Sequence, residues 1–168
     1  MGYSIRSFED GDAEALAELG RAAIGAIGPE AYSEEQVEAW LSNFAGPEVY
    51  QAQADAGTQI FIAVDDDDNP VAYAMLELTG HLDHLYCHPD HTREGIASSL
   101  LETAALFAKY HAITHLFTEA SEIAKPAFES AGYTAVRKRT FEIDGVEITN
   151  WAMVREIEPP APQKKRAL

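Results

Sequence analysis

The chain has 168 residues, of which 46% are hydrophobic and 24% are charged, a profile typical of one globular domain and not of a disordered chain. Its formal net charge of −16 repels a phosphate backbone and disfavours nucleic acid as a partner, while it is compatible with a cationic or amine substrate. The single cysteine excludes an internal disulfide, and the lack of an apolar signal region or of about 20 consecutive apolar residues predicts a cytoplasmic protein that enters no membrane.

The first part of the sequence predicts one strand and two helices. Residues 3–8 alternate between apolar and polar types, as in a short strand. Residues 13–27 carry apolar side chains at helical spacing, and Asp10 or Asp12 is placed to cap that helix. A second helix begins at Ser33, where the segment SEEQ has the spacing of a capping box. A Gly-Pro pair stops each of the two helices.

Strands dominate the middle of the chain. Residues 59–64 and 71–78 are rich in strand-forming types, and the polar turn between them predicts a hairpin. Residues 81–87 form a third strand, and 95–110 have one apolar face, which predicts a helix. The remaining elements are a strand at 115–119, a helix at 123–131, and two strands at 134–143 and 146–155 joined by the hairpin signal Asp144-Gly145.

This order of elements predicts a single mixed α/β domain over residues 1–156. Residues 157–168 are rich in proline and then basic, which predicts a disordered tail.

The most informative segment is 85–101, LYCHPDHTREGIASSLL, in which a strand ends, the chain turns at proline and a helix begins beside Gly95 and Ala97. The first N–H groups of a helix have no intrahelical partner, and the helix dipole adds partial positive charge. Such a helix start binds anions, and Gly95 lets a phosphate approach the backbone without a Cβ in the way.

This segment resembles motif A of the GCN5-related N-acetyltransferases, the GNAT family, whose pattern is Gln/Arg-x-x-Gly-x-Gly/Ala. Gly95 and Ala97 match the two small positions, whereas Thr92 stands where the family prefers Gln or Arg. Residues 121–133, SEIAKPAFESAGY, are similar to the family segment Asn-x-x-Ala-x-x-Phe-Tyr-x-x-x-Gly-Phe. Residues 32–40 and 149–153 also resemble the YafP-like bacterial subgroup, so the resemblance covers almost the whole chain.

The resemblance implies the GNAT fold: a mixed, mostly antiparallel sheet of about seven strands with helices on both faces and a splay between the fourth and fifth strands. It also implies direct transfer of an acetyl group from acetyl-CoA to an amine of a small molecule or peptide in a ternary complex. The histidines at positions 81, 84, 88 and 91 fall on both strand faces and on a turn, so no metal site is expected, and the protein is expected to be a monomer or homodimer. The implied contacts with the cofactor are Leu85, Tyr86, Cys87, Thr92, Arg93, Glu94, Gly95, Ile96, Ala97, Ser98, Ser121 and Phe128.

The sequence indicates the general acid and the general base less clearly than the cofactor site. Phe128 stands where many members carry an acidic tyrosine, so water, another residue or unaided departure of the thiolate serves instead. For the base, alignment on motif A places His81 where some members carry a glutamate, and Asp83 shares its strand face. Glu119, at the end of the fifth strand, is a second candidate. The alternative is that His81 only borders a turn and Asp83 hydrogen-bonds locally.

Tyr32, Trp40 and Tyr73 are the expected acceptor-pocket residues, since the first two helices cover the acceptor in this family; alternatively Trp40 is a core residue. His84 is expected to pack, and Cys87 has no assured histidine neighbour for acyl-enzyme chemistry. Because of Thr92 and the missing tyrosine, a catalytically silent acyl-CoA-binding module stays open as an alternative function. A nucleotide-binding α/β protein is disfavoured because neither glycine-rich phosphate motif occurs.

Overall fold

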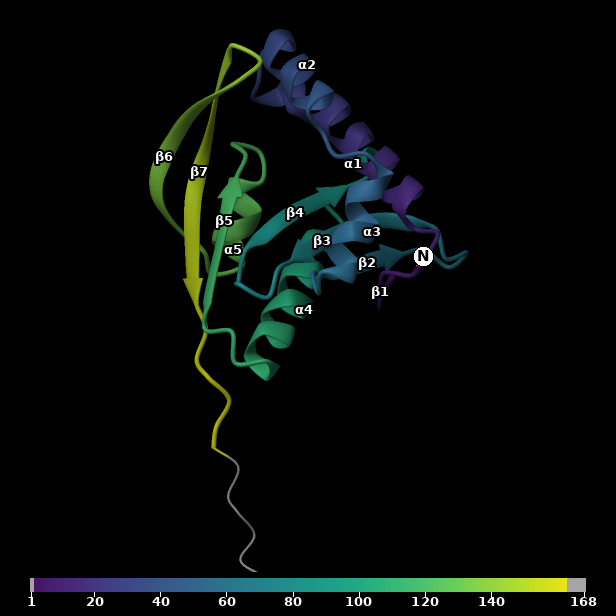
Figure 1. Cartoon of the computed structure of the whole chain (residues 1–168), viewed down its shortest axis with the longest axis vertical. Helices are drawn as coiled ribbons and strands as arrows, with labels where there is room; N and C mark the ends of the chain where they lie inside the picture. The colour runs from purple at the N-terminus through teal and green to yellow at the C-terminus, as the bar shows by residue number, and fades with distance from the viewer. Residues whose placement is uncertain (1, 163–168) are drawn as a thin grey trace, which may run out of the picture.

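The strands form two antiparallel sheets that touch at one end and diverge at the other (Figure 1). The structure is a computed structural model that describes residues 2–162. The first sheet has the order β1-β2-β3-β4 and the second the order β5-β7-β6. The strands are β1 (Ser4–Ser7), β2 (Gln59–Val64), β3 (Pro70–Leu76), β4 (Leu82–Cys87), β5 (His115–Ala120), β6 (Thr134–Ile143) and β7 (Val146–Glu156).

Helices cover both faces of the first sheet, as the family resemblance implies. They are α1 (Ala13–Ile27), α2 (Glu34–Ser42), α3 (Pro47–Asp55), α4 (Ile96–Tyr110) and α5 (Lys125–Ser130), with short 3-10 turns η1 (Gly28–Glu30) and η2 (Pro89–His91). Within the described residues, none of these helices is both long and apolar enough to cross a membrane. Residues 157–162 form neither helix nor strand, and the rest of the predicted tail, 163–168, lies outside the described residues.

The helix starts test the predicted caps. The Ser33 side chain accepts from the Gln36 N–H while the Gln36 side chain accepts from the Ser33 N–H, so the predicted capping box is confirmed. The predicted cap position of α1 is confirmed at Asp12, but its side chain makes no cap hydrogen bond. The carboxylate of Asp12 stands at the right position but is held by Arg6 at 2.8 Å and by the Glu9 N–H, and the guanidinium's hydrogen bond lowers the pKa of Asp12.

Helix α3 was not predicted at all. The pair Gly46-Pro47 does end the preceding segment, but Pro47 is also the first residue of α3. Proline is tolerated there because its missing N–H has no intrahelical acceptor to serve. Tyr50 of α3 is fully buried against α1 and β3, and this tertiary contact stabilises a helix whose sequence alone has a weak apolar face.

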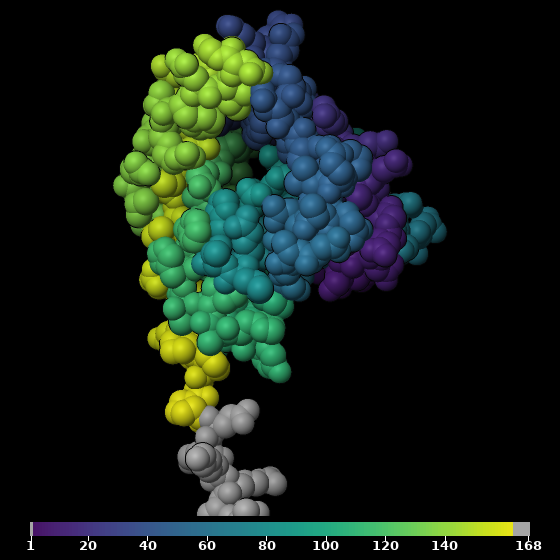
Figure 2. All heavy atoms as spheres, in the orientation of Figure 1, coloured from purple at the N-terminus to yellow at the C-terminus, as the bar shows by residue number. Residues whose placement is uncertain are grey.

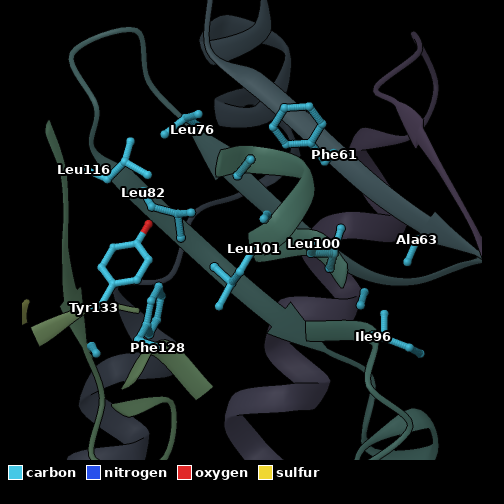
Figure 3. Packing of buried hydrophobic residues seen from close by; sticks show 14 of the residues in the cluster. Phe61, Ala63, Leu76, Leu82, Ile96, Leu100, Leu101, Leu116, Phe128 and Tyr133 are labelled. Atoms are coloured by element: carbon cyan, nitrogen blue, oxygen red, sulfur yellow. The ribbon is translucent and has the colours of Figure 1, made fainter. Parts of the chain in front are cut away.

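Alternation along β2 divides the core into two layers. Ile60 and Ile62 pack with α1 and α3, while Phe61 and Ala63 pack with α4 on the opposite face. Figure 3 shows the second layer, in which Leu101 of α4 lies on the side of the aromatic pair Phe128 and Tyr133, and Leu100 on the side of Ala63 and Ile96. A third cluster joins the end of α1 and helix α2 to the β6–β7 hairpin.

The two sheets meet at a short seam, defined by Gly80, His81, Phe117 and Thr118. The Phe117 N–H donates to the Gly80 carbonyl at 3.1 Å, and His81 and Phe117 form an isolated parallel bridge. The buried hydroxyl of Thr118 then donates to the Leu82 carbonyl at 2.7 Å, in place of a backbone donor from β5. Beyond this point β4 and β5 separate, which confirms the predicted splay between the fourth and fifth strands.

The β6–β7 hairpin turns as its sequence predicts. Asp144 and Gly145 have φ of 50° and 78°, the two positive values that a type I′ turn requires. Its tip is fastened to α2, because the Asn43 amide donates to the Asp144 carboxylate at 2.7 Å and the Gln36 amide donates to the Glu147 carbonyl at 2.8 Å. The hairpin therefore forms a wall opposite the splay (Figure 1).

Candidate active site

The segment before α4 presents a row of free backbone donors. Within the described part of the chain, the N–H groups of residues 93–98 donate to no other group. Arg93 and Gly95 both have positive φ, 62° and 79°, and the space that a Cβ on Gly95 would occupy is open. These donors and the helix dipole suit the binding of an anion such as a pyrophosphate.

A groove of about 560 Å³ runs from this segment along the splay; we call it the α4 groove. Its lining residues are Ile27, Glu30, Leu85, Cys87, His91, Thr92, Arg93, Gly95, Ile96, Ala97, Ser98, Ile123, Ala124, Pro126 and Ala127. The residues expected to contact a cofactor at the start of α4 therefore line one groove, except Glu94.

Glu94 is turned away from the α4 groove. Its carboxylate accepts a hydrogen bond from the Tyr3 hydroxyl, which also lies 3.0 Å from Nδ1 of His91. The hydrogen bond to Glu94 raises the pKa of Tyr3 to about 12. Tyr3, the residue before β1, thus holds the charge of Glu94 away from the free N–H groups at the start of α4.

Two smaller cavities continue from the α4 groove through the splay. The splay cavity, about 90 Å³, shares Leu85 and Cys87 with the groove. The aromatic pocket, about 130 Å³, shares Trp40, Tyr86 and Ser121 with the splay cavity. Figure 2 shows this face of the molecule hollowed between the β6–β7 hairpin and the helices of the first half of the chain. The cavities therefore connect the α4 groove to the space under α2 and the hairpin.

The aromatic pocket is lined by Tyr32, Trp40, Tyr86, Glu119, Ser121, Phe141, Ile143, Ile148 and Asn150. Tyr32 fixes its shape, because its hydroxyl donates to the Thr149 carbonyl at 2.9 Å and accepts from the Glu122 N–H at 3.0 Å. The ring of Tyr32 also meets Trp40 edge to face at 5.6 Å. Both residues expected in the pocket from the first two helical segments thus line it.

Glu119 and His81, two separate candidates in the sequence, form one pair. Nε2 of His81 lies 2.6 Å from Oε2 of Glu119, and the imidazole stacks on Phe117 at 4.9 Å. Burial alone would lower the pKa of His81, but the hydrogen bond and charge of Glu119 outweigh it, so the pKa is raised above the usual 6.5. Further carboxylates, Asp83 and Glu77, act in the same direction, and Glu77 lies 3.5 Å from Nδ1 of the imidazole.

Asp83 is not the partner of His81 that strand alternation predicts. β4 begins only at Leu82, and the register of its pairing with β3 shifts at Leu76, so the simple alternation fails there. The carboxylate of Asp83 instead lies 3.8 Å from Nε2 of His84.

Tyr73, expected in the acceptor pocket, lies in the core instead, with no exposed surface. Its hydroxyl is 2.6 Å from that of Tyr50 and 3.0 Å from Nδ1 of His84, behind the ring of Tyr86. Burial raises the pKa of Tyr73 and lowers that of His84. His84 therefore packs, as predicted.

Of two further residues expected to contact the cofactor, Phe128 lies in the core and Cys87 lines the α4 groove. Phe128, expected to contact the cofactor, is 2% exposed and packs against Tyr133 in the core, while Pro126 and Ala127 line the groove from α5. Cys87 does line the groove, but burial raises its thiol pKa to about 11, which disfavours a nucleophilic thiolate.

Some residues of the site carried no signal in the sequence. Tyr3 reaches Glu94 across 91 positions, and the buried hydroxyl of Thr118 reaches β4 across 36. Phe141 and Asn150 belong to the pocket only because the hairpin folds over the splay. Among the described residues, no group of three or more His, Cys, Asp or Glu side chains is placed to hold a metal ion.

Comparison with known proteins identifies the family. The model of the Acetyltransferase (GNAT) domain matches residues 29–155, so the chain belongs to the GNAT family and is an acetyl-CoA-dependent N-acetyltransferase. The uncharacterized N-acetyltransferase YafP of Escherichia coli K12 is 28% identical over 149 residues, which span 89% of this chain and 93% of YafP.

Solved structures agree with this assignment. A GCN5-related N-acetyltransferase from Rhodopseudomonas palustris is 30% identical and superposes with a TM-score of 0.83, covering 94% of this chain and 97% of its own. The PaiA N-acetyltransferase of Thermoplasma acidophilum, solved in complex with coenzyme A, shares the fold at 18% identity and a TM-score of 0.75, covering 94% of this chain and 100% of its own. The predicted family and fold are therefore confirmed.

Proposed function

We propose that acetyl-CoA binds in the α4 groove and that its acetyl group passes directly to an amine held in the aromatic pocket. The free N–H groups of residues 93–98 support binding of the pyrophosphate, with Thr92 and Ser98 beside it. Leu85 and Cys87 border both the groove and the splay cavity, which suits the thioester end. The acceptor is the amine of a small molecule or a peptide.

The His81–Glu119 pair is the proposed base, and the observation that carries it is the 2.6 Å contact at the wall of the aromatic pocket. An ammonium ion must lose a proton before its nitrogen attacks the thioester carbon. Above the pKa of His81 the imidazole is neutral beside the carboxylate of Glu119. When the imidazole takes up the acceptor's proton, the imidazolium–carboxylate ion pair forms. The C–N bond forms as the C–S bond breaks; the second proton leaves the new amide nitrogen, and the departing thiolate is protonated through water.

The test replaces each member of the pair by alanine and measures release of the CoA thiol with an amine acceptor. Loss of general-base help is expected to lower kcat by about 10²–10⁴-fold. Because His81 and Glu119 act as one unit, the double variant is expected to be no slower than the worse single variant. Binding of acetyl-CoA, measured as its shift of the melting temperature, stays unchanged. A kcat within threefold of the parent would remove the pair from the mechanism, and binding without turnover of any amine would support the silent module instead.

A further inference from the structure

The lining of the aromatic pocket restricts the kind of amine that fits. Four of its side chains are aromatic, namely Tyr32, Trp40, Tyr86 and Phe141, and two are isoleucines. Glu119 is the one charged side chain among the lining residues that the structure describes. An ammonium group is favoured by both features, because carboxylates pair with it and aromatic faces attract it.

The described lining of this pocket offers an anionic group on the acceptor no cationic partner. No basic side chain is among the described lining residues; Arg139 contacts two of them, because it donates to the Asn150 amide oxygen at 3.1 Å and lies over the ring of Phe141. Lys138 pairs with Glu122 at 3.4 Å. A carboxylate beside the amine would therefore be desolvated against aromatic rings and would face Glu119, both of which are unfavourable.

The size of the pocket sets a second limit. Its volume is about 130 Å³, and an apolar protein cavity of roughly 150 Å³ holds one benzene ring. Tyr32, just before α2, bonds to β7 and to the segment after β5, and the hairpin tip is fastened to α2, so the walls are held at this spacing. The part of the acceptor that enters the pocket is thus about one ring in size.

We infer that the acceptor is a compact primary amine with an apolar or aromatic body of about one ring and no anionic group next to the nitrogen. This inference rests on the proposed function, because it takes the aromatic pocket as the acceptor site. The net charge of −16 acts in the same direction, since it attracts a cationic amine and repels an acidic one.

Three acceptors of matched shape test the inference: phenethylamine, phenylalaninamide and phenylalanine. We expect kcat/KM to fall in that order, with phenethylamine at least 100-fold above phenylalanine. Phenylalaninamide has nearly the size of phenylalanine without its negative charge, so its intermediate value would separate charge from size. Equal use of phenylalanine and phenethylamine, or preference for phenylalanine, would overturn the inference. If no amine, including a lysine-containing peptide, releases CoA while acetyl-CoA still binds, the proposed function itself fails.

A substitution in the wall tests the same idea from the protein's side. Ile143 lines the pocket at the end of β6 and is only partly buried, so a lysine there can extend its charged end toward the pocket mouth. Ile143→Lys is expected to reduce the preference for phenethylamine over phenylalanine at least tenfold, whereas Ile143→Met, similar in length and uncharged, leaves the ratio within threefold. An unchanged ratio in a folded Ile143→Lys variant would contradict the inference; thermal melting establishes the folding of both variants.

Discussion

The His81–Glu119 pair predicts a specific pH dependence of catalysis. The activity should fall as the pH drops through the pKa of His81, which lies above 6.5 because of Glu119. In the variant Glu119→Gln the hydrogen bond loses its charge, and burial then lowers the pKa of His81 unopposed by its nearest carboxylate. The acidic limb of the kcat/KM profile should therefore move to lower pH.

The strength of the attraction between His81 and Glu119 follows from the geometry. Two unit charges about 4 Å apart interact by about 1 kcal/mol in water and about 4 kcal/mol at an effective dielectric constant near 20. The Glu119 side chain is 37% exposed, which places the pair near the weaker limit. Loss of this attraction lowers the pKa of His81, so we expect the acidic limb to move to lower pH.

The assay is kcat/KM for the amine between pH 5 and 9 at saturating acetyl-CoA, with Glu77→Gln as the matched control. Glu77 lies farther from the imidazole, at 3.5 Å, so its variant should shift the limb less. Stability gives a second readout. The raised pKa of His81 stabilises the folded state fully below the unfolded value near 6.5, and this contribution is lost as the pH rises through the folded value. Glu119→Gln should lower the melting temperature more at pH 6 than at pH 9. A limb that stays in place would refute the assignment of His81.

Three further variants test the surrounding structure. Tyr3→Phe releases the carboxylate of Glu94 and should raise the KM for acetyl-CoA severalfold in initial-rate assays without changing kcat, and adding Glu94→Gln should restore the KM; no restoration would contradict the role given to the carboxylate. Thr118→Val leaves a buried carbonyl of β4 without its donor, at a cost of about 1–3 kcal/mol, and should lower the melting temperature while Thr118→Ser does not. Gly80→Ala places a Cβ against a backbone carbonyl at positive φ and should destabilise by about 2 kcal/mol or more in denaturant unfolding, whereas Gly25→Ala, with open space around its Cβ, should not.

Local patterns predicted most of the fold because their causes are local. The capping box at Ser33 and the Asp144-Gly145 turn each depend on residues within a few positions, and both are confirmed. Helix α3 is not predictable in this way, because Gly46-Pro47 has the same local pattern at the end of one helix as at the start of the next. Its stabilising contact through Tyr50 also joins segments that are distant in the sequence.

The site was predictable in part for the same reason. The loop before α4 presents free backbone N–H groups, a feature that its own sequence predicts. The His81–Glu119 contact spans 38 positions, and only the seam between the sheets brings the two residues together. The prediction that Tyr73 lines the acceptor pocket is wrong, because an aromatic residue on a strand has the same local pattern whether it faces a pocket or the core. Here its hydroxyl is hydrogen-bonded to that of Tyr50 in the core.

If acetyl-CoA and the acceptor bind as proposed, the separation of the two sheets assigns their recognition to different parts of the chain. The α4 groove is built from the ends of α1 and β4, from α4 and from the segment leading into α5, whereas α2 and the β6–β7 hairpin supply most of the aromatic pocket. Helix α2 is hydrogen-bonded to the tip of the hairpin, so the two can be exchanged together. Such an exchange would change the acceptor preference and leave the rest of the fold in place. The architecture thus lets acceptor range diversify while the acetyl-CoA machinery is retained.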